Sequence, residues 1–154
     1  MGKGLREREK RSVERWVRRL ETRHIRETKK AEMLRFLNLP YPVMGNGKHR
    51  LVFDLENGYV LKVAKVEKGI RCNRNEINLF LQSPPALRKH LCPISSFSHG
   101  WLIMKKMEKR LPETKKNKEK TEAMLRLFAE RGIRISDIIK KDGRLKEGNL
   151  RLDR

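Results

Sequence analysis

The residues best placed to do chemistry are a lysine and a glutamate that lie fourteen positions apart in the middle of the chain. Lys62 lies in the apolar run Tyr-Val-Leu-Lys, and Glu76 lies in the polar run Asn-Arg-Asn-Glu-Ile. A strand lysine that pairs with a glutamate on a packed helix holds its ammonium group where it can meet phosphate oxygens. Gly45 and Gly47 come before this pair, and glycines let a backbone approach phosphates closely because they carry no side chain. These residue types, in this order, predict a phosphate-binding site.

Two regions predict the antiparallel strand pairs that would carry these residues. Residues 51–55 and 59–64 are β-rich runs on either side of Asn57-Gly58. Asn-Gly between two such runs is a strong hairpin signal because both turn positions tolerate positive φ. Residues 94–97 and 101–107 form a second pair around a Ser-His-Gly turn.

Three helices are expected around these strands. A long basic helix is predicted over residues 3–38, where apolar side chains recur at three- and four-residue steps until the chain reaches Pro40. Residues 73–82 predict the helix that presents the glutamate. Residues 123–131 predict an amphipathic helix that ends at Gly132. Strands and helices in this arrangement predict an α+β fold.

The order of these features resembles the protein-kinase-like family, and most closely small bacterial and phage kinase-like proteins such as the group named for its link to the PhoP regulon. The resemblance covers residues 43–107 and implies a kinase-like small lobe, an antiparallel sheet with a helix C. It implies that Lys62 holds the phosphates of a nucleotide, with Lys65 as the alternative register, and that Glu76 pairs with that lysine.

Other positions carry weaker likeness to the same family. Gly45 and Gly47 resemble the first two glycines of the phosphate-covering loop, and Arg50 stands where the third would fall. Met104 resembles the start of the hinge that would receive an adenine ring. The opposing interpretation is that Lys62 is a solvated residue on the outer face of a hairpin, Glu76 a surface residue, the glycines a turn, and Met104 a core residue.

The resemblance weakens toward the C-terminal part of the chain. Asp137 resembles the catalytic-loop aspartate, and Asn149 resembles the metal-binding asparagine, with Asp142 at the usual spacing as its alternative. No Asp-x-Gly follows them, so the resemblance implies a partial large lobe without the second magnesium ligand. We expect no phosphotransfer by this chain alone and only weak binding of ATP with magnesium. A residual or truncated serine/threonine-type protein kinase is the alternative.

The strongest compositional signal is positive charge. The 154 residues carry a formal net charge of +20, which attracts polyanions such as nucleic acid, an anionic membrane or an acidic protein surface. The basic N-terminal helix is the candidate contact surface, through its arginines Arg6, Arg8, Arg11, Arg15, Arg18 and Arg19. We expect a non-catalytic, pseudokinase-like module that binds an acidic macromolecule. The alternative is a nucleic-acid-binding regulator, in which Trp16 either stacks on a base or, more simply, faces the core.

The remaining features set the expected organisation and setting. Three segments are expected: a basic N-terminal helix (1–39), a kinase-like small lobe (43–107), and a linker, helix and partial large lobe (108–154). The two cysteines, Cys72 and Cys92, have no metal-ligand spacing and are expected to be reduced thiols. No signal peptide and no membrane-spanning stretch is expected, so the protein is predicted to be cytoplasmic.

Overall fold

The computed structural model describes residues 4–106 and 114–132, which fall into two compact units. Of these residues, unit 1 contains 4–81 together with Pro93–Lys105, and unit 2 contains Gln82–Cys92, Lys106 and 114–132. The helices and strands, in chain order, are α1 (Glu7–Thr22), α2 (Lys30–Leu37), β1 (Val43–Asn46), β2 (Arg50–Asp54), β3 (Tyr59–Ala64), α3 (Glu67–Gln82), α4 (Pro85–Arg88), β4 (Ile94–Ser98), β5 (Trp101–Lys105) and α5 (Lys115–Glu130).

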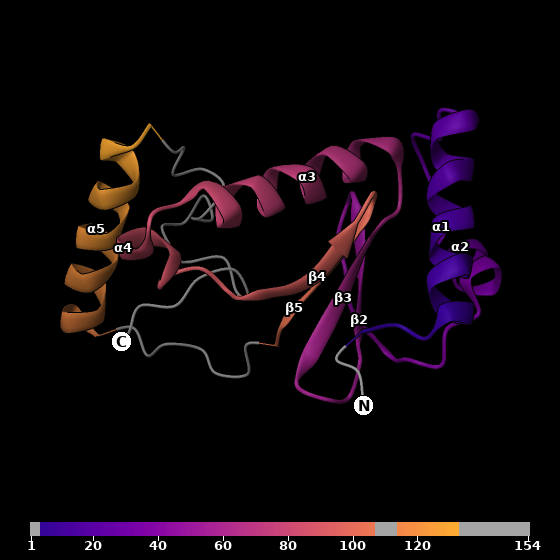
Figure 1. The fold of residues 1–154 in the computed structure, drawn as a ribbon, viewed down its shortest axis with the longest axis horizontal. Coiled ribbons are helices and arrows are strands. Elements are labelled where there is room, and N and C mark those ends of the chain that lie inside the picture. The colour runs from indigo at the N-terminus through magenta and orange to yellow at the C-terminus, as the bar shows by residue number, and fades with distance from the viewer. Residues whose placement is uncertain (1–3, 107–113, 133–154) are drawn as a thin grey trace. The chain divides into compact units, whose positions relative to one another are not determined.

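The strands of the described residues form a five-stranded antiparallel sheet in the order β1-β2-β3-β5-β4 (Figure 1). Both predicted strand pairs are present. In the turn between β2 and β3, Glu56 and Gly58 have φ values of 59° and 87°. The N–H of Leu55 donates to the Tyr59 carbonyl at 3.0 Å, an ordinary hydrogen-bond length. The α+β fold is therefore confirmed, and the Asn57-Gly58 signal marked its first hairpin correctly.

The predicted single helix over residues 3–38 is wrong, because this stretch forms α1 and α2 with a break between them. Thr22 ends α1, and His24 takes up the left-handed region at a φ of 49°. The N–H of Ile25 then bonds back to the carbonyl of Leu20 at 3.0 Å. At the end of α2, Asn38 is also left-handed and caps the helix. The helical periodicity on both sides of the break hid it in the sequence.

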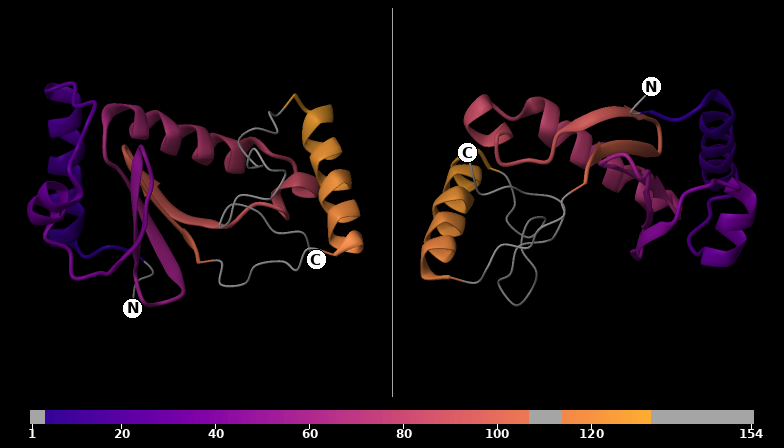
Figure 2. Two further views of the ribbon diagram at one scale, coloured as in Figure 1. Left: turned by 180° about the vertical axis from the view of Figure 1, so that it is seen from behind. Right: turned by 90° about the horizontal axis from the view of Figure 1, so that it is seen from below.

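One face of the sheet is covered by α1 and α2, while α3 crosses the other (Figures 1 and 2). The apolar positions of α1 recur at steps of three and four and are fully buried against the sheet; they are Val13, Trp16, Val17 and Leu20. Opposite them lie Leu51, Phe53, Leu61, Val63 and Ile103. Each buried side chain of this size stabilises the fold by about 1.5–3 kcal/mol. The basic N-terminal segment is thus part of the core of unit 1.

The helix on the other face, α3, begins at Glu67, six residues before the predicted start. Its first turn packs against the β1–β2 turn so closely that a Cβ atom added at Gly69 would lie 2.1 Å from the carbonyl oxygen of His49. A glycine at this point therefore allows close contact between the helix and the turn.

The turn between β4 and β5 lies against α1. Gly100 has a φ of 85°, and a Cβ atom added there would lie 2.5 Å from a methyl carbon of Val17. The Gly100 carbonyl accepts a hydrogen bond from the N–H of Ala64 at 3.0 Å. This glycine is required both by its backbone conformation and by the close approach of α1.

Unit 2 contains α4 and α5. The Thr114 hydroxyl accepts the N–H of Asn117 at 3.1 Å and caps α5. Gly132 follows this helix with a φ of 74°, as predicted for its C-terminal glycine. The helix begins at Lys115 rather than at residue 123, so part of the expected polar connector is helical.

Cys72 and Cys92 are both free thiols. Among the helices of the described residues, none is long and apolar enough to cross a membrane.

Gly100→Ala is expected to destabilise unit 1 by about 3 kcal/mol, because it adds both left-handed strain and a clash with Val17. The matched control is Gly58→Ala, which also has a positive φ but no atom within 4 Å of the added Cβ. It should cost only the strain, about 1–2 kcal/mol. Urea unfolding of both variants measures the difference, and equal losses would contradict the close packing of the turn on α1.

Candidate functional site

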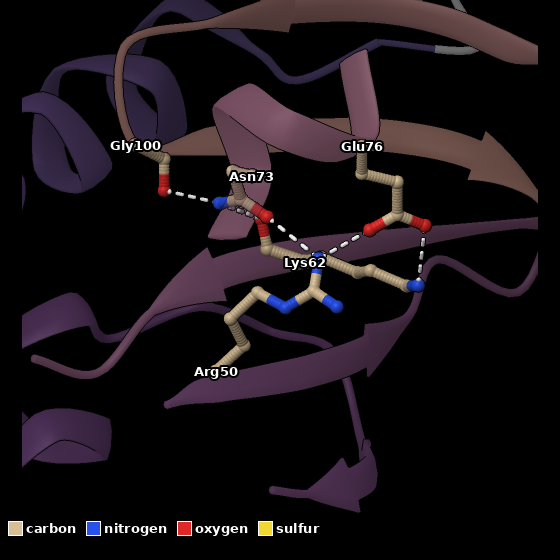
Figure 3. A network of polar contacts seen from close by, with 5 residues as sticks. All are labelled: Arg50, Lys62, Asn73, Glu76 and Gly100. Carbon is tan, nitrogen blue, oxygen red and sulfur yellow. Dashed lines mark hydrogen bonds and ion pairs between the residues drawn. The ribbon is translucent and has the colours of Figure 1, made fainter. Parts of the chain in front are cut away.

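The expected ion pair between β3 and α3 is present (Figure 3). The Nζ of Lys62 lies 3.0 Å from Oε1 of Glu76, and the two side chains are only 10% and 16% exposed. Lys62 is therefore not a solvated residue on the outer face of a hairpin, and Glu76 is not an ordinary surface residue. The alternative register is also excluded, because Lys65 binds Asn46 and the Gly47 carbonyl instead.

A second cation shares the carboxylate. The guanidinium of Arg50, at the start of β2, donates to the other carboxylate oxygen of Glu76. Arg50 occupies the position where the family resemblance would place a third glycine. The residue that departs from the family pattern thus supplies a direct contact to the glutamate.

Two opposing effects act on the carboxyl group of Glu76. Burial alone would raise its pKa, but the charges of Lys62 and Arg50, with the hydrogen bonds that they donate, outweigh burial and lower the pKa below its usual value. The glutamate is therefore ionised at neutral pH and holds both cations in place.

Asn73 lies one turn before Glu76 on α3 and is completely buried. Its Oδ1 accepts a hydrogen bond from Arg50 at 2.9 Å, and its Nδ2 donates to the carbonyl of Gly100 at 2.9 Å (Figure 3). This role was not predicted, although the Asn-Arg-Asn-Glu motif contained the signal. A buried amide three residues before the glutamate lies on the same helix face. Asn73 fixes α3 to the β4–β5 turn and orients Arg50.

The strand register places three of the predicted cofactor-binding residues on the same face of the sheet. Gly45 pairs with Val52, and Val52 pairs with Lys62 across the next strand. Met104 lies opposite Val60, two residues along from the lysine. Directly opposite residues, and residues two apart on one strand, share a face of the sheet. Because Lys62 on this face contacts Glu76 of α3, this is the face that α3 crosses. Met104 is 2% exposed, in agreement with the interpretation as a core residue.

The glycine turn between β1 and β2 is closed by internal hydrogen bonds. The N–H of Gly47 donates to the Arg50 carbonyl at 3.0 Å, and the Gly47 carbonyl accepts from Nζ of Lys65 at 3.1 Å. Neither Gly45 nor Gly47 has a φ in the left-handed region. At Gly45 the missing side chain leaves the sheet face open beside Val52, whose Cβ would be 3.5 Å from an added Cβ.

The predicted contact arginines lie on the outside of α1. At about 100° per residue, Arg8, Arg11, Arg15 and Arg18 fall within an arc of about 80°, opposite the buried apolar side. All four are exposed. Arg6 is exposed just before the helix. Arg19 is partly buried, and its guanidinium nitrogen Nη2 lies 3.9 Å from Oε1 of Glu32. Sequence spacing alone would allow Glu7 to pair with Arg11 and Glu14 with Arg18, but neither ion pair forms; Oε1 of Glu7 instead lies 3.7 Å from Nζ of Lys10.

Trp16, which the sequence left open between stacking and the core, belongs to the core. It is 1% exposed, and its indole N–H donates to the carbonyl of Ala64 at 2.9 Å.

In residues 4–106 and 114–132, no three His, Cys, Asp or Glu side chains lie close enough together to hold a metal ion. The predicted catalytic Asp137 and metal-binding Asn149 lie outside the described residues.

Replacing Glu76 by glutamine should destabilise the protein by about 3 kcal/mol at neutral pH, because the buried Lys62 and the partly buried Arg50 lose their counter-charge. A lowered folded-state pKa means that this contribution is complete above the unfolded-state pKa of about 4.3 and is lost as pH falls through the folded value. The gap between the parent protein and Glu76→Gln should therefore close on acidification. Urea unfolding from pH 7 to pH 3 measures it.

Glu119→Gln is the matched control, because Glu119 is exposed on α5. A gap that stays constant with pH, or one as small as that of the control, would contradict the proposed balance of charges at Glu76.

Comparisons of the chain with protein-family models, with curated proteins and with solved structures found no match.

Proposed function

We propose that this chain is a kinase-like small lobe that serves as a binding module and contacts an acidic macromolecule through the outer face of α1. The observation that carries this proposal is the division of α1 into two sides. The inner side is buried against the sheet, and the outer side presents the arginine row, defined here as Arg8, Arg11, Arg15 and Arg18.

The arginine row is available to a partner. None of its four members forms an ion pair with an acidic side chain in the part of the chain that the structure describes. Exposed arginines without internal counter-charges retain their attraction for an external polyanion. The net charge of +20 adds a long-range field in the same sense.

The helix that carries the arginine row is held in place by the rest of unit 1. Trp16 and Leu20 are buried beneath it, and the hydroxyl of Ser12 donates to the Leu37 carbonyl at 2.6 Å, which ties α1 to α2. Binding therefore orders side chains only, without the cost of folding a helix.

The kinase-like part of the proposal is supported by the sheet and α3. An antiparallel sheet carries a lysine on its third strand, and the following helix supplies the glutamate that pairs with it at 3.0 Å. This pair supports the proposal because kinase small lobes contain a lysine–glutamate pair of the same kind. The internal hydrogen bonds of the glycine turn and the place of Arg50 beside the pair favour a scaffold role over catalysis.

The quadruple variant R8Q/R11Q/R15Q/R18Q should bind polyanions at least about tenfold more weakly than the parent protein. The slope of log affinity against log salt should fall by about 3 units for a single-stranded oligonucleotide, from about 0.7 per lost phosphate contact. Fluorescence anisotropy with a labelled oligonucleotide and with labelled poly-glutamate measures both quantities.

The control K115Q/K116Q/K118Q/R126Q removes the same charge from exposed positions of α5. It should keep most of the affinity. Equal losses in the two variants would show that net charge alone governs binding, and the proposal would then be wrong.

A second candidate function, weak nucleotide binding, is favoured by one observation. Two cationic groups, from Lys62 and Arg50, converge on one carboxylate on the same sheet face as Gly45 and Met104. Ammonium and guanidinium groups both bind phosphate oxygens. ATP with magnesium is the ligand that the family resemblance implies for this position.

For this candidate, Lys62→Gln should weaken the binding of a fluorescent ATP analogue with magnesium by about tenfold, the effect of one charge-assisted contact. Lys68→Gln is the control, because Lys68 is exposed on α3. Circular dichroism checks that both variants fold. Binding that is undetectable in the parent protein, or unchanged in Lys62→Gln, would rule out a nucleotide held at this pair.

A further inference from the structure

We propose that the acidic partner of α1 is a single-stranded nucleic acid, with its phosphates along the arginine row and one base stacked at Phe36. This inference rests on the proposed function, because it names the partner of the same surface. Three features of unit 1 carry it: the kind of cation on α1, the acidic edge of the helix, and an exposed aromatic ring beside the arginines.

The cations of α1 are almost all arginines. In residues 6–23 the single lysine is Lys10, whereas the arginines are Arg6, Arg8, Arg11, Arg15, Arg18, Arg19 and Arg23. A planar guanidinium donates two parallel hydrogen bonds to a phosphate and also stacks on aromatic rings and bases. An ammonium group acts only as a point charge. A surface that bound its partner by charge alone would not require arginine rather than lysine.

The arginine row is regular. Its members follow one another at three- or four-residue steps, which places successive Cβ atoms about 5–6 Å apart on one side of a helix. From Arg8 to Arg18 the row extends over about 15 Å. Because phosphates are evenly spaced along a nucleic-acid backbone, regularly spaced arginines can contact successive phosphates.

An acidic edge limits where the polyanion can lie. Glu7, Glu14 and Glu21 repeat every seven residues and so form one line along α1. At about 100° per residue this line lies on one side of the arginine row, and Arg19 lies on the other. Glu7 lies beside Lys10 and Glu21 beside His99, so Glu14 contributes most of the repulsion on this side. This repulsion shifts a phosphate backbone toward Arg19 and α2, where the carboxylate of Glu32 is already paired with Arg19.

Phe36 of α2 lies on that favoured side. Its ring is 38% exposed, and its inner edge packs against Trp16 with ring centroids 5.2 Å apart. The guanidinium carbon of Arg19 lies 5.6 Å from the centre of the Phe36 ring. Because Arg19 follows Arg15 by one helical turn, this cation–π pair continues the arginine row.

The exposed Phe36 ring and the Arg19 guanidinium beside it distinguish between the possible partners. Unpaired bases stack on aromatic side chains and on arginine planes, whereas a duplex keeps its base faces inside the helix. The glutamate and aspartate side chains of an acidic protein carry no aromatic ring that could stack. A single strand therefore uses both the charge and the ring.

The test measures anisotropy of labelled (dT)12, labelled (U)12, a labelled 12-base-pair duplex and labelled poly-glutamate with the full chain. Phe36→Ala and Phe36→Leu should each weaken binding of the single strands by about tenfold, the effect of one lost base stack, and leave poly-glutamate unchanged. Phe36→Leu keeps apolar packing on Trp16, so a loss of affinity in this variant would report a lost base stack rather than unfolding. Phe36→Tyr should keep the affinity, and Phe97→Ala is the control because Phe97 is 45% exposed on β4.

The outcomes separate this inference from the proposed function. Binding of single strands that is unchanged in Phe36→Leu, or no tighter than binding of the duplex or poly-glutamate, would overturn the inference. The arginine-row variant would still lose affinity for polyanions in that case. If that variant binds every probe as tightly as the α5 control does, the proposed function itself fails. Tighter binding of (U)12 than of (dT)12 would assign the partner to RNA, and the reverse to DNA.

Discussion

The structure of unit 1 depends on how the backbone polar groups at the end of β3 are satisfied. Beyond the sheet pairing, the carbonyl of Ala64 accepts the Trp16 indole N–H, and the N–H of Lys65 donates to the His49 carbonyl at 2.8 Å. The Lys65 carbonyl accepts the hydroxyl of Thr28. Buried groups of this kind must find partners, since each one left unpaired costs about 1–3 kcal/mol. The partners come from α1, the β1–β2 turn and the α1–α2 connection, so one short segment fixes three others.

This arrangement connects the two faces of the sheet. On one face, Trp16 holds α1 and places the arginine row outward. On the other, Asn73 holds α3 and orients Arg50 toward Glu76. Gly100 touches both sides, because its Cα faces Val17 and its carbonyl accepts from Asn73. The basic helix is accordingly an integral layer of unit 1 rather than an appended arm.

Much of this could be predicted from the sequence where local signals were strong. The Asn57-Gly58 turn marked the first hairpin, and the spacing of Lys62 and Glu76 was enough to predict their contact. The break between α1 and α2 could not be predicted, because no proline or glycine marks residues 23–29 and the helical period continues beyond them. The roles of Arg50 and Asn73 depend on contacts between elements distant in the chain, and the local pattern shows only that Asn73 and Glu76 share one face of a helix. For the same reason, the burial of one whole side of α1 became clear only with the sheet in place.

The positions of the two tryptophans have a practical consequence. Trp16 and Trp101 are the tryptophans of the chain, and both are buried in the core of unit 1, at 1% and 3% exposure. The indole N–H of Trp16 has a partner, whereas that of Trp101 has none among the described residues. Unit 2 contains no tryptophan. Intrinsic emission of the protein therefore reports the melting of unit 1 alone, and any helical signal that persists after this emission has shifted belongs to unit 2.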